Sequence, residues 1–203
     1  VRLGGPDDGW EPDWLALAQV VLRNPGALWL IGNEPEDRAQ EVLTPAQFAE
    51  RYLRVHMQIR ARDPSARIAI GGVVQPTPLR LEWLRRVVNE LRNRYRDPRD
   101  PNRLPIDVWN IHVQILRESR NEAGAGIPVG LDEYDEGRMY SYNQNAGLAD
   151  FIQLVTEFRQ WMRDQGERNK PLIISEYGVL YPSVLLNDWR DADYGDEVLK
   201  EFM

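Results

Sequence analysis

Four short apolar runs divide the sequence, and longer stretches with helical periodicity separate them. The runs cover residues 27–32, 67–74, 106–113 and 172–175. Continuous apolar runs of this length are typical of strands that are buried on both faces. Because such strands alternate with predicted helices, the pattern favours βα units built on a parallel sheet. We therefore expect an α/β protein whose strands end at a common edge.

Helix signals lie between these runs. Thr44 is placed as an N-cap and Pro45 as the first helical residue, and Asp63 followed by Pro64 marks the end of that helix. The residues 79–95 carry leucine and valine at helical spacing. The predicted helices are 11–23, 45–62, 79–95 and 148–166, with a further helix expected in the tail 182–203.

The stretch 117–147 is rich in Gly, Asn and acidic residues and contains several tyrosines. It is too long for a routine connection, so it predicts a functional βα loop or a small excursion. Its acidic pairs, at 132–133 and 135–136, lack the alternating ligand pattern of a calcium loop, and we interpret them as solvated. Gly71 and Gly72 follow a strand without a phosphate-binding motif, which favours close backbone packing.

Composition excludes several classes of protein. The chain has 203 residues, enough for about one domain, and a net charge of −7 with Lys and Arg scattered among acidic residues. This distribution argues against nucleic-acid binding, and no run approaches the roughly 20 apolar residues of a membrane span. The chain has no cysteine, so a disulfide framework and a thiolate nucleophile are both excluded. The two histidines predict no metal site, and no cofactor motif is present.

The N-terminal residues carry neither an initiator Met nor the apolar core of a signal peptide. The chain is therefore expected to be a mature, trimmed or excised piece. Its compartment stays open, with a secreted or extracytoplasmic location favoured.

Two of the predicted strands run directly into a glutamate. Trp29-Leu-Ile-Gly-Asn-Glu34 and Leu172-Ile-Ile-Ser-Glu176 each place a carboxylate where a strand ends. Parallel α/β enzymes carry their chemistry at the carboxyl ends of the strands, so these two side chains are expected at one rim. Glycoside hydrolysis needs one protonated and one ionised carboxyl group, about 5–5.5 Å apart when the configuration is retained. Asn33 adds an amide that can donate to a sugar hydroxyl.

Each candidate also has a plain structural interpretation. Taken alone, Glu34 would be a solvated loop residue or an acid at a helix start, and Asn33 a turn residue. His112 follows an apolar strand and would suit a buried core position as well as a site, whereas His56 is expected to be structural. Tyrosines of the long loop are more often surface packing than sugar subsites. The predicted site comprises Glu34 and Glu176 as catalytic residues, with Asn33, His112, Tyr177, Trp109 and Tyr140 as substrate-binding residues.

The run from Trp29 to Pro35 resembles the fourth-strand motif of glycoside hydrolase clan A, and Ile173-Ile-Ser-Glu-Tyr-Gly178 resembles its seventh-strand motif. This resemblance implies that Glu34 is the general acid/base and Glu176 the nucleophile. The segments 70–72 and 110–112 resemble the ends of the fifth and sixth strands, which would put His112 near the nucleophile. The loop 126–130 is similar to that of the smaller endo-β-1,3-glucanase-like members of the clan.

The resemblance implies a (β/α)8 barrel fold, of which residues 1–203 would form one partial domain covering about strands four to seven. Segments resembling the first three strands and the eighth are not found. The implied function is a retaining O-glycoside hydrolase acting on a β-linked saccharide. The alternative is a non-catalytic carbohydrate-binding or sensor domain that keeps the rim without the closed site. An incomplete barrel would also leave open strand edges, which favour self-association.

Overall fold

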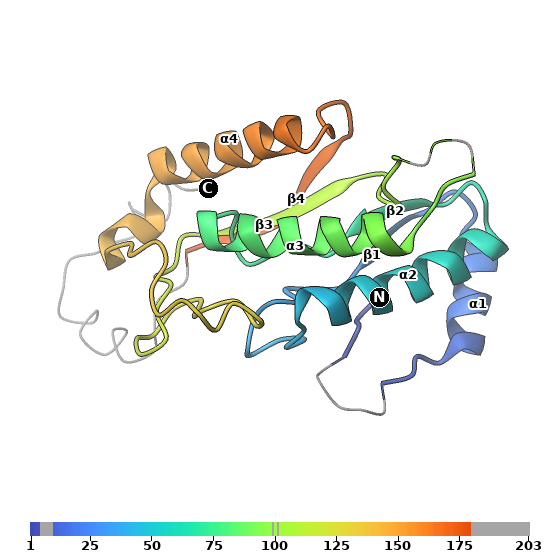
Figure 1. The fold of residues 1–203 in the computed structure, drawn as a ribbon, viewed down its shortest axis with the longest axis horizontal. Coiled ribbons are helices and arrows are strands. Elements are labelled where there is room, and N and C mark those ends of the chain that lie inside the picture. Colours follow the sequence, from blue (N-terminus) through green and yellow to red (C-terminus); the bar gives the residue numbers. More distant parts are fainter. Residues whose placement is uncertain (5–9, 99, 101, 180–203) are drawn as a thin grey trace.

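The computed structural model describes residues 1–4, 10–98, 100 and 102–179, and this part of the chain contains four strands and four α-helices. Figure 1 shows how they are arranged. The elements, in chain order, are α1 (Trp14–Arg23), β1 (Leu28–Ile31), α2 (Pro45–Arg62), β2 (Arg67–Ile70), α3 (Pro78–Arg94), β3 (Trp109–Gln114), the 3-10 helix η1 (Tyr142–Ala146), α4 (Leu148–Asp164) and β4 (Leu172–Gly178). Strands and helices therefore alternate, as predicted.

All the strand pairings are parallel. β1 pairs with β2, and β3 pairs with β4. A parallel bridge between Ala69 and Val108 joins the two pairs, and His112 N donates to Val73 O at 2.9 Å just beyond it. The strands consequently lie side by side in the order in which they occur in the chain. Within the described residues they do not close into a barrel.

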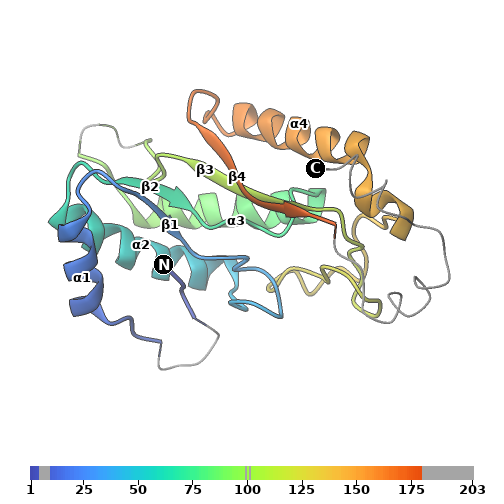
Figure 2. The same cartoon turned by 180° about the vertical axis from the view of Figure 1, so that it is seen from behind.

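The helices α2, α3 and α4 cover the same face of the strands, which Figure 1 shows from the helical side and Figure 2 from behind. The core lies between these two layers. Phe48 and Tyr52 of α2, Trp83 of α3 and Phe158 of α4 are fully buried there, together with Ile111 of β3. Burial of these large apolar side chains supplies the main driving force for the arrangement. Among the described helices, none is both long and apolar enough to cross a bilayer.

Local signals position the helix ends. The Thr44 side chain accepts a hydrogen bond from Gln47 N, and the Gln47 side chain accepts one from Thr44 N, so the two residues form a capping box. Asp13 caps α1 by accepting from Ala16 N at 2.9 Å, which is why α1 begins at Trp14, three residues after the predicted start. The helices predicted at 79–95 and 148–166 are confirmed to within two residues.

The strand limits differ more from the prediction. β3 begins at Trp109, three residues after the predicted start; the residues just before it meet β2 irregularly, because Asp107 N and Val108 N both donate to Ile68 O while the Asp107 carboxylate accepts from Ile68 N. β4 continues to Gly178, three residues beyond the predicted end, because it stays paired with β3 up to Gln114. The stretch 117–147 is an irregular excursion that contains η1. The helix expected in 182–203 lies outside the described residues.

Replacing Thr44 with Ala removes the acceptor of the capping box, and we expect it to lower the free energy of unfolding by about 1 kcal/mol. Urea denaturation measures this change. Thr156→Ala is the matched control, because the Thr156 hydroxyl only donates to the Ile152 carbonyl inside α4. An equal loss in both variants would contradict the capping role.

His56 gives a second prediction, on acid stability. It is 5% exposed and stacks on Tyr52, and burial together with nearby Arg60 lowers its pKa from 6.5 to about 4. Between these two values the unfolded chain binds a proton at His56 that the folded chain does not, so the contribution of His56 to stability falls as the pH is lowered from 6.5 to 4. The loss should amount to about 3 kcal/mol. His56→Phe should remove this slope in denaturation curves measured across that range, and an unchanged slope would refute the assignment.

Candidate active site

Glu34 lies just beyond the end of β1, where the chain reverses. Gly32 has a φ of +91° and Glu34 a φ of +47°, a left-handed backbone that is uncommon for a residue with a side chain. Glu34 N donates to Gly72 O at 2.8 Å, so the turn is fastened to the end of β2. The Glu34 carboxylate Oε1 lies 2.8 Å from His112 Nδ1. The backbone strain thus holds a largely buried carboxylate against a histidine.

Glu176 reaches the same histidine because of an irregularity in β4. Ile174 pairs with Ile111, but the next pair is Glu176 with His112, so Ser175 is left over as a bulge. A regular ladder would have put Ser175 beside His112 and turned Glu176 to the opposite face. With the bulge, Glu176 Oε2 lies 3.5 Å from His112 Nδ1. The Glu176 side chain is 51% exposed and is therefore open to a ligand.

Gly72 makes room for the His112 ring. A Cβ at position 72 would lie 2.5 Å from His112 Cδ2 and 2.7 Å from His112 Nε2, closer than real contacts allow. A Cβ at Gly71 would similarly lie 2.7 Å from the backbone of Gly32. The prediction that this glycine pair serves close packing is confirmed.

A cavity of about 270 Å³ opens on this cluster. Asn33, Asn110, His112 and Glu176 line it with polar groups. Asn110 is 2% exposed, and its Oδ1 has no hydrogen-bond partner among the described residues. The remaining lining residues are Val1, Arg2, Leu30, Gly32 and Ser175. The site thus presents amides, an imidazole and a carboxylate to any bound molecule.

The two carboxylates lie close together without a basic side chain to balance them. One oxygen of Glu34, one of Glu176 and a ring nitrogen of His112 all lie within 4.8 Å of one another. In the described part of the chain, the only ion-pair partner of either glutamate within 4 Å is His112. Two carboxylates at this separation repel each other when both are charged, so the arrangement favours a cation between them.

Two further predicted binding residues, Tyr177 and Tyr140, differ in exposure and in the side chains that they contact. Tyr177 follows Glu176, is 59% exposed, and packs edge-on against Phe151 with ring centroids 6.1 Å apart. Tyr140 is only 3% exposed, and its hydroxyl accepts from Arg138 at 3.2 Å. Tyr177 thus contacts α4 and is not among the residues that line the cavity, and Tyr140 is part of the packing of the long loop.

Trp109 does not reach the cavity. It is fully buried between β3 and α4, with its ring 5.2 Å from that of Trp161 and 6.0 Å from that of Phe158. Successive residues of a strand point to opposite faces, so the strand that turns Asn110 and His112 toward the cavity turns Trp109 toward the helices. The expectation that Trp109 contacts a substrate is corrected: it is a core residue.

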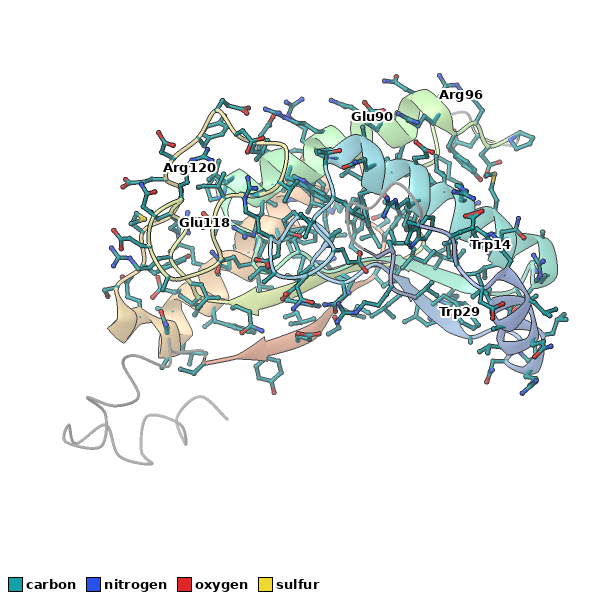
Figure 3. The ribbon with its side chains drawn as sticks, turned by 90° about the horizontal axis from the view of Figure 1, so that it is seen from below. Trp14, Trp29, Glu90, Arg96, Glu118 and Arg120 are labelled. Carbon is teal, nitrogen blue, oxygen red and sulfur yellow. The ribbon has the colours of Figure 1, made fainter. Side chains whose placement is uncertain are left out.

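Sequence reasoning missed the buried ion cluster that joins the loops at this end of the strands. Arg80 of α3 is fully buried and donates to Glu36 Oε1 at 2.9 Å and to Ala125 O at 2.6 Å, and it also pairs with Glu118. Figure 3 shows Glu118 at the end of the molecule that carries the long loop, opposite Trp14 on α1. The sequence signal was faint, because a single arginine within an amphipathic helix is normally exposed.

The Arg80 cluster fastens three loops at one point. Glu36 follows β1, Glu118 follows β3, and Arg80 lies in the first turn of α3, the helix after β2. Burial raises the pKa of Glu36 to about 7, although the Arg80 charge and the hydrogen bond from Val74 N oppose this rise. Glu118 also accepts from Thr77 and from Arg138 N. Glu36 is two residues from Glu34, so this cluster holds the turn that carries the candidate acid.

Comparison with known proteins supports a glycosidase fold. No protein-family model matches the chain, and neither does any curated protein. Among solved structures, it is similar to a curdlan-specific exo-β-1,3-glucanase of family GH128 subgroup III from Blastomyces gilchristii, solved with glucose. The identity is 18%, the TM-score is 0.53, and the match covers 96% of this chain and 74% of that one. At this identity the likeness shows the fold alone.

Two further solved structures match more loosely. A subgroup II endo-β-1,3-glucanase of GH128 from Pseudomonas viridiflava gives a TM-score of 0.47 at 18% identity, over 85% of this chain and 51% of that one. A family 51 α-L-arabinofuranosidase from Bifidobacterium longum gives 0.45 at 18% identity, over 80% of this chain and 28% of that one. The chain thus spans between about a quarter and three quarters of these enzymes' lengths.

The role of the Arg80 cluster is tested by removing the arginine charge alone. Arg80→Met leaves Glu36 and Glu118 buried without a counter-charge, and we expect it to lower the free energy of unfolding by about 3–5 kcal/mol. The triple variant with Glu36→Gln and Glu118→Gln keeps acceptors for the neighbouring donors and should recover most of that loss. Urea denaturation measures the free energy of unfolding of both variants, and equal values for the two would contradict the electrostatic explanation.

Proposed function

We propose that this chain is the catalytic part of a retaining O-glycoside hydrolase. The observation that carries the proposal is the approach of the Glu34 and Glu176 carboxylates to within 4.8 Å of each other, beside a cavity that Glu176 and His112 line. Retaining enzymes hold their two carboxyl groups about 5–5.5 Å apart, whereas inverting enzymes need about 6.5–9.5 Å to fit a water molecule. The separation here supports the retaining geometry.

We assign the two carboxylates different catalytic roles because their surroundings differ. Glu34 is largely buried and hydrogen-bonded to His112, which suits a group that gives its proton to the departing glycosidic oxygen. Glu176 is half-exposed at the cavity, where its oxygen can attack the anomeric carbon and form a glycosyl-enzyme ester. Glu34 then takes a proton from water, and that water displaces Glu176. Two inversions at the anomeric carbon give net retention.

The neighbouring polar groups position this chemistry. His112 Nδ1 lies 2.8 Å from Glu34 and 3.5 Å from Glu176, so the ring fixes both carboxylates relative to each other. Asn33 lines the cavity beside Glu34 and supplies an amide for a sugar hydroxyl. The exposed ring of Tyr177 offers a surface on which a sugar ring stacks.

We further propose that residues 1–203 form one partial (β/α)8 domain that corresponds to strands four to seven. Four parallel strands in chain order, with α2, α3 and α4 on one face, support this assignment. The carboxyl ends of the strands carry the candidate site, as in such barrels. The likeness to the Blastomyces enzyme extends over most of this chain.

A β-1,3-glucan is the first substrate to test, because the similar Blastomyces structure is that of a curdlan-specific exo-β-1,3-glucanase. Carbohydrate binding without cleavage is the second candidate. It is favoured by the open face of the strands seen in Figure 2 and by the exposure of Glu176. Calorimetry with laminari-, cello- and manno-oligosaccharides, run beside a reducing-sugar assay, distinguishes the two. Binding without product release would identify a binding module.

Catalysis by Glu176 is tested with Glu176→Ala. The variant lacks the attacking oxygen, so laminarin turnover should disappear, and added azide should restore part of it by giving a glycosyl azide of inverted configuration. Glu34→Gln should reduce turnover by about 10²–10⁴-fold, because the amide cannot deliver a proton. Nuclear magnetic resonance of the products and a reducing-sugar assay measure both effects.

The matched control is Glu133→Ala, which removes a carboxylate from the exposed part of the long loop. Its turnover should equal that of the unaltered chain. Normal turnover by Glu176→Ala would overturn the assignment of the nucleophile.

A further inference from the structure

The cluster of Glu34, His112 and Glu176 also has the composition of a transition-metal site. A histidine nitrogen and two carboxylate oxygens converge within 4.8 Å, and no lysine or arginine among the described residues pairs with either carboxylate. Imidazole with carboxylate is a ligand set that zinc accepts, commonly with three protein ligands and an open fourth position for water. We propose that Zn²⁺ binds to these three residues and thereby competes with a carbohydrate for the cavity.

The distances fit this ion after a small adjustment. Ligand atoms about 2.0–2.2 Å from zinc in a tetrahedron lie about 3.3–3.5 Å from one another. His112 Nδ1 already lies 2.8 Å from Glu34 Oε1 and 3.5 Å from Glu176 Oε2. The Glu176 contact already has the required length, whereas the Glu34 carboxylate must withdraw from His112 Nδ1 by about 0.5 Å to admit the ion. The exposure of Glu176 also gives the ion a way in from solvent.

Asn110 supplies an independent observation. Its side chain lines the same cavity, it is 2% exposed, and its Oδ1 has no hydrogen-bond partner within the described residues. A buried amide oxygen of this kind calls for a donor. Water on the open position of a bound zinc ion would provide one inside the cavity.

Binding is tested by calorimetry with ZnCl₂ at pH 7 on the chain after EDTA treatment. One Zn²⁺ should bind per chain, and neither Ca²⁺ nor Mg²⁺ should bind comparably, because both prefer all-oxygen sites. The chain has two histidines, so its histidine resonances provide an internal control. The signals of His112 should shift on adding zinc, whereas those of His56, buried in α2, should not.

Variants of the proposed ligands test which side chains bind zinc. Glu176→Gln and His112→Gln should each weaken zinc binding more than tenfold, whereas Glu133→Gln in the exposed loop should leave it unchanged. Glu176 is half-exposed, so its variant tests the site even if His112→Gln does not fold. Absence of binding, equal affinity in Glu176→Gln, or equal binding of Ca²⁺ would each overturn the proposal.

Competition with a carbohydrate rests on the proposed glycosidase function. Zn²⁺ should inhibit laminarin hydrolysis competitively, and EDTA should restore it. If the chain hydrolyses none of the glucans, the proposed function fails, but calorimetry and the histidine spectra still decide whether zinc binds. If zinc binds as described while hydrolysis continues unchanged, the shared site is refuted and the glycosidase assignment stands.

Discussion

The ion pairs that Arg80 makes with Glu36 and Glu118 hold together the end of the strands that carries the candidate site. The three side chains are fully buried and come from segments that follow three successive strands. Burying charges is costly, and a buried pair is tolerated only when its remaining hydrogen-bonding groups are also satisfied. Thr77, Val74 and two loop carbonyls fill most of these positions. The loops around the cavity are consequently fastened to one another beneath the carboxylates that face it.

The backbone, rather than side-chain packing, aims the two carboxylates at each other. The left-handed turn at Glu34 and the bulge at Ser175 each depart from regular geometry by one residue, and both departures occur where a strand ends. Such departures cost free energy and persist where the surrounding structure imposes them. Among the described side chains, His112 is the one that pairs with both carboxylates, so its ring sets how the two lie relative to each other.

Features that depend on short sequence patterns could be predicted from the sequence. The cap at Thr44, the strand preceding Glu34 and the convergence of Glu34 with Glu176 follow from spacing, turn residues and the parallel arrangement. The Arg80 cluster and the bulge could not, because they depend on contacts between distant segments. Trp109 was misplaced although its strand alternates apolar and polar residues. That alternation identifies Asn110 as a cavity residue and Trp109 as core.

Gly72 takes no part in the chemistry, yet its missing side chain decides where His112 lies. Any other residue would place a Cβ within 2.7 Å of the imidazole nitrogen that faces it. A saturation mutagenesis survey would therefore score position 72 as intolerant alongside the acidic pair, and a reader of such data alone would mistake it for a participant in the reaction. Its intolerance would report excluded volume, the space that the imidazole already fills.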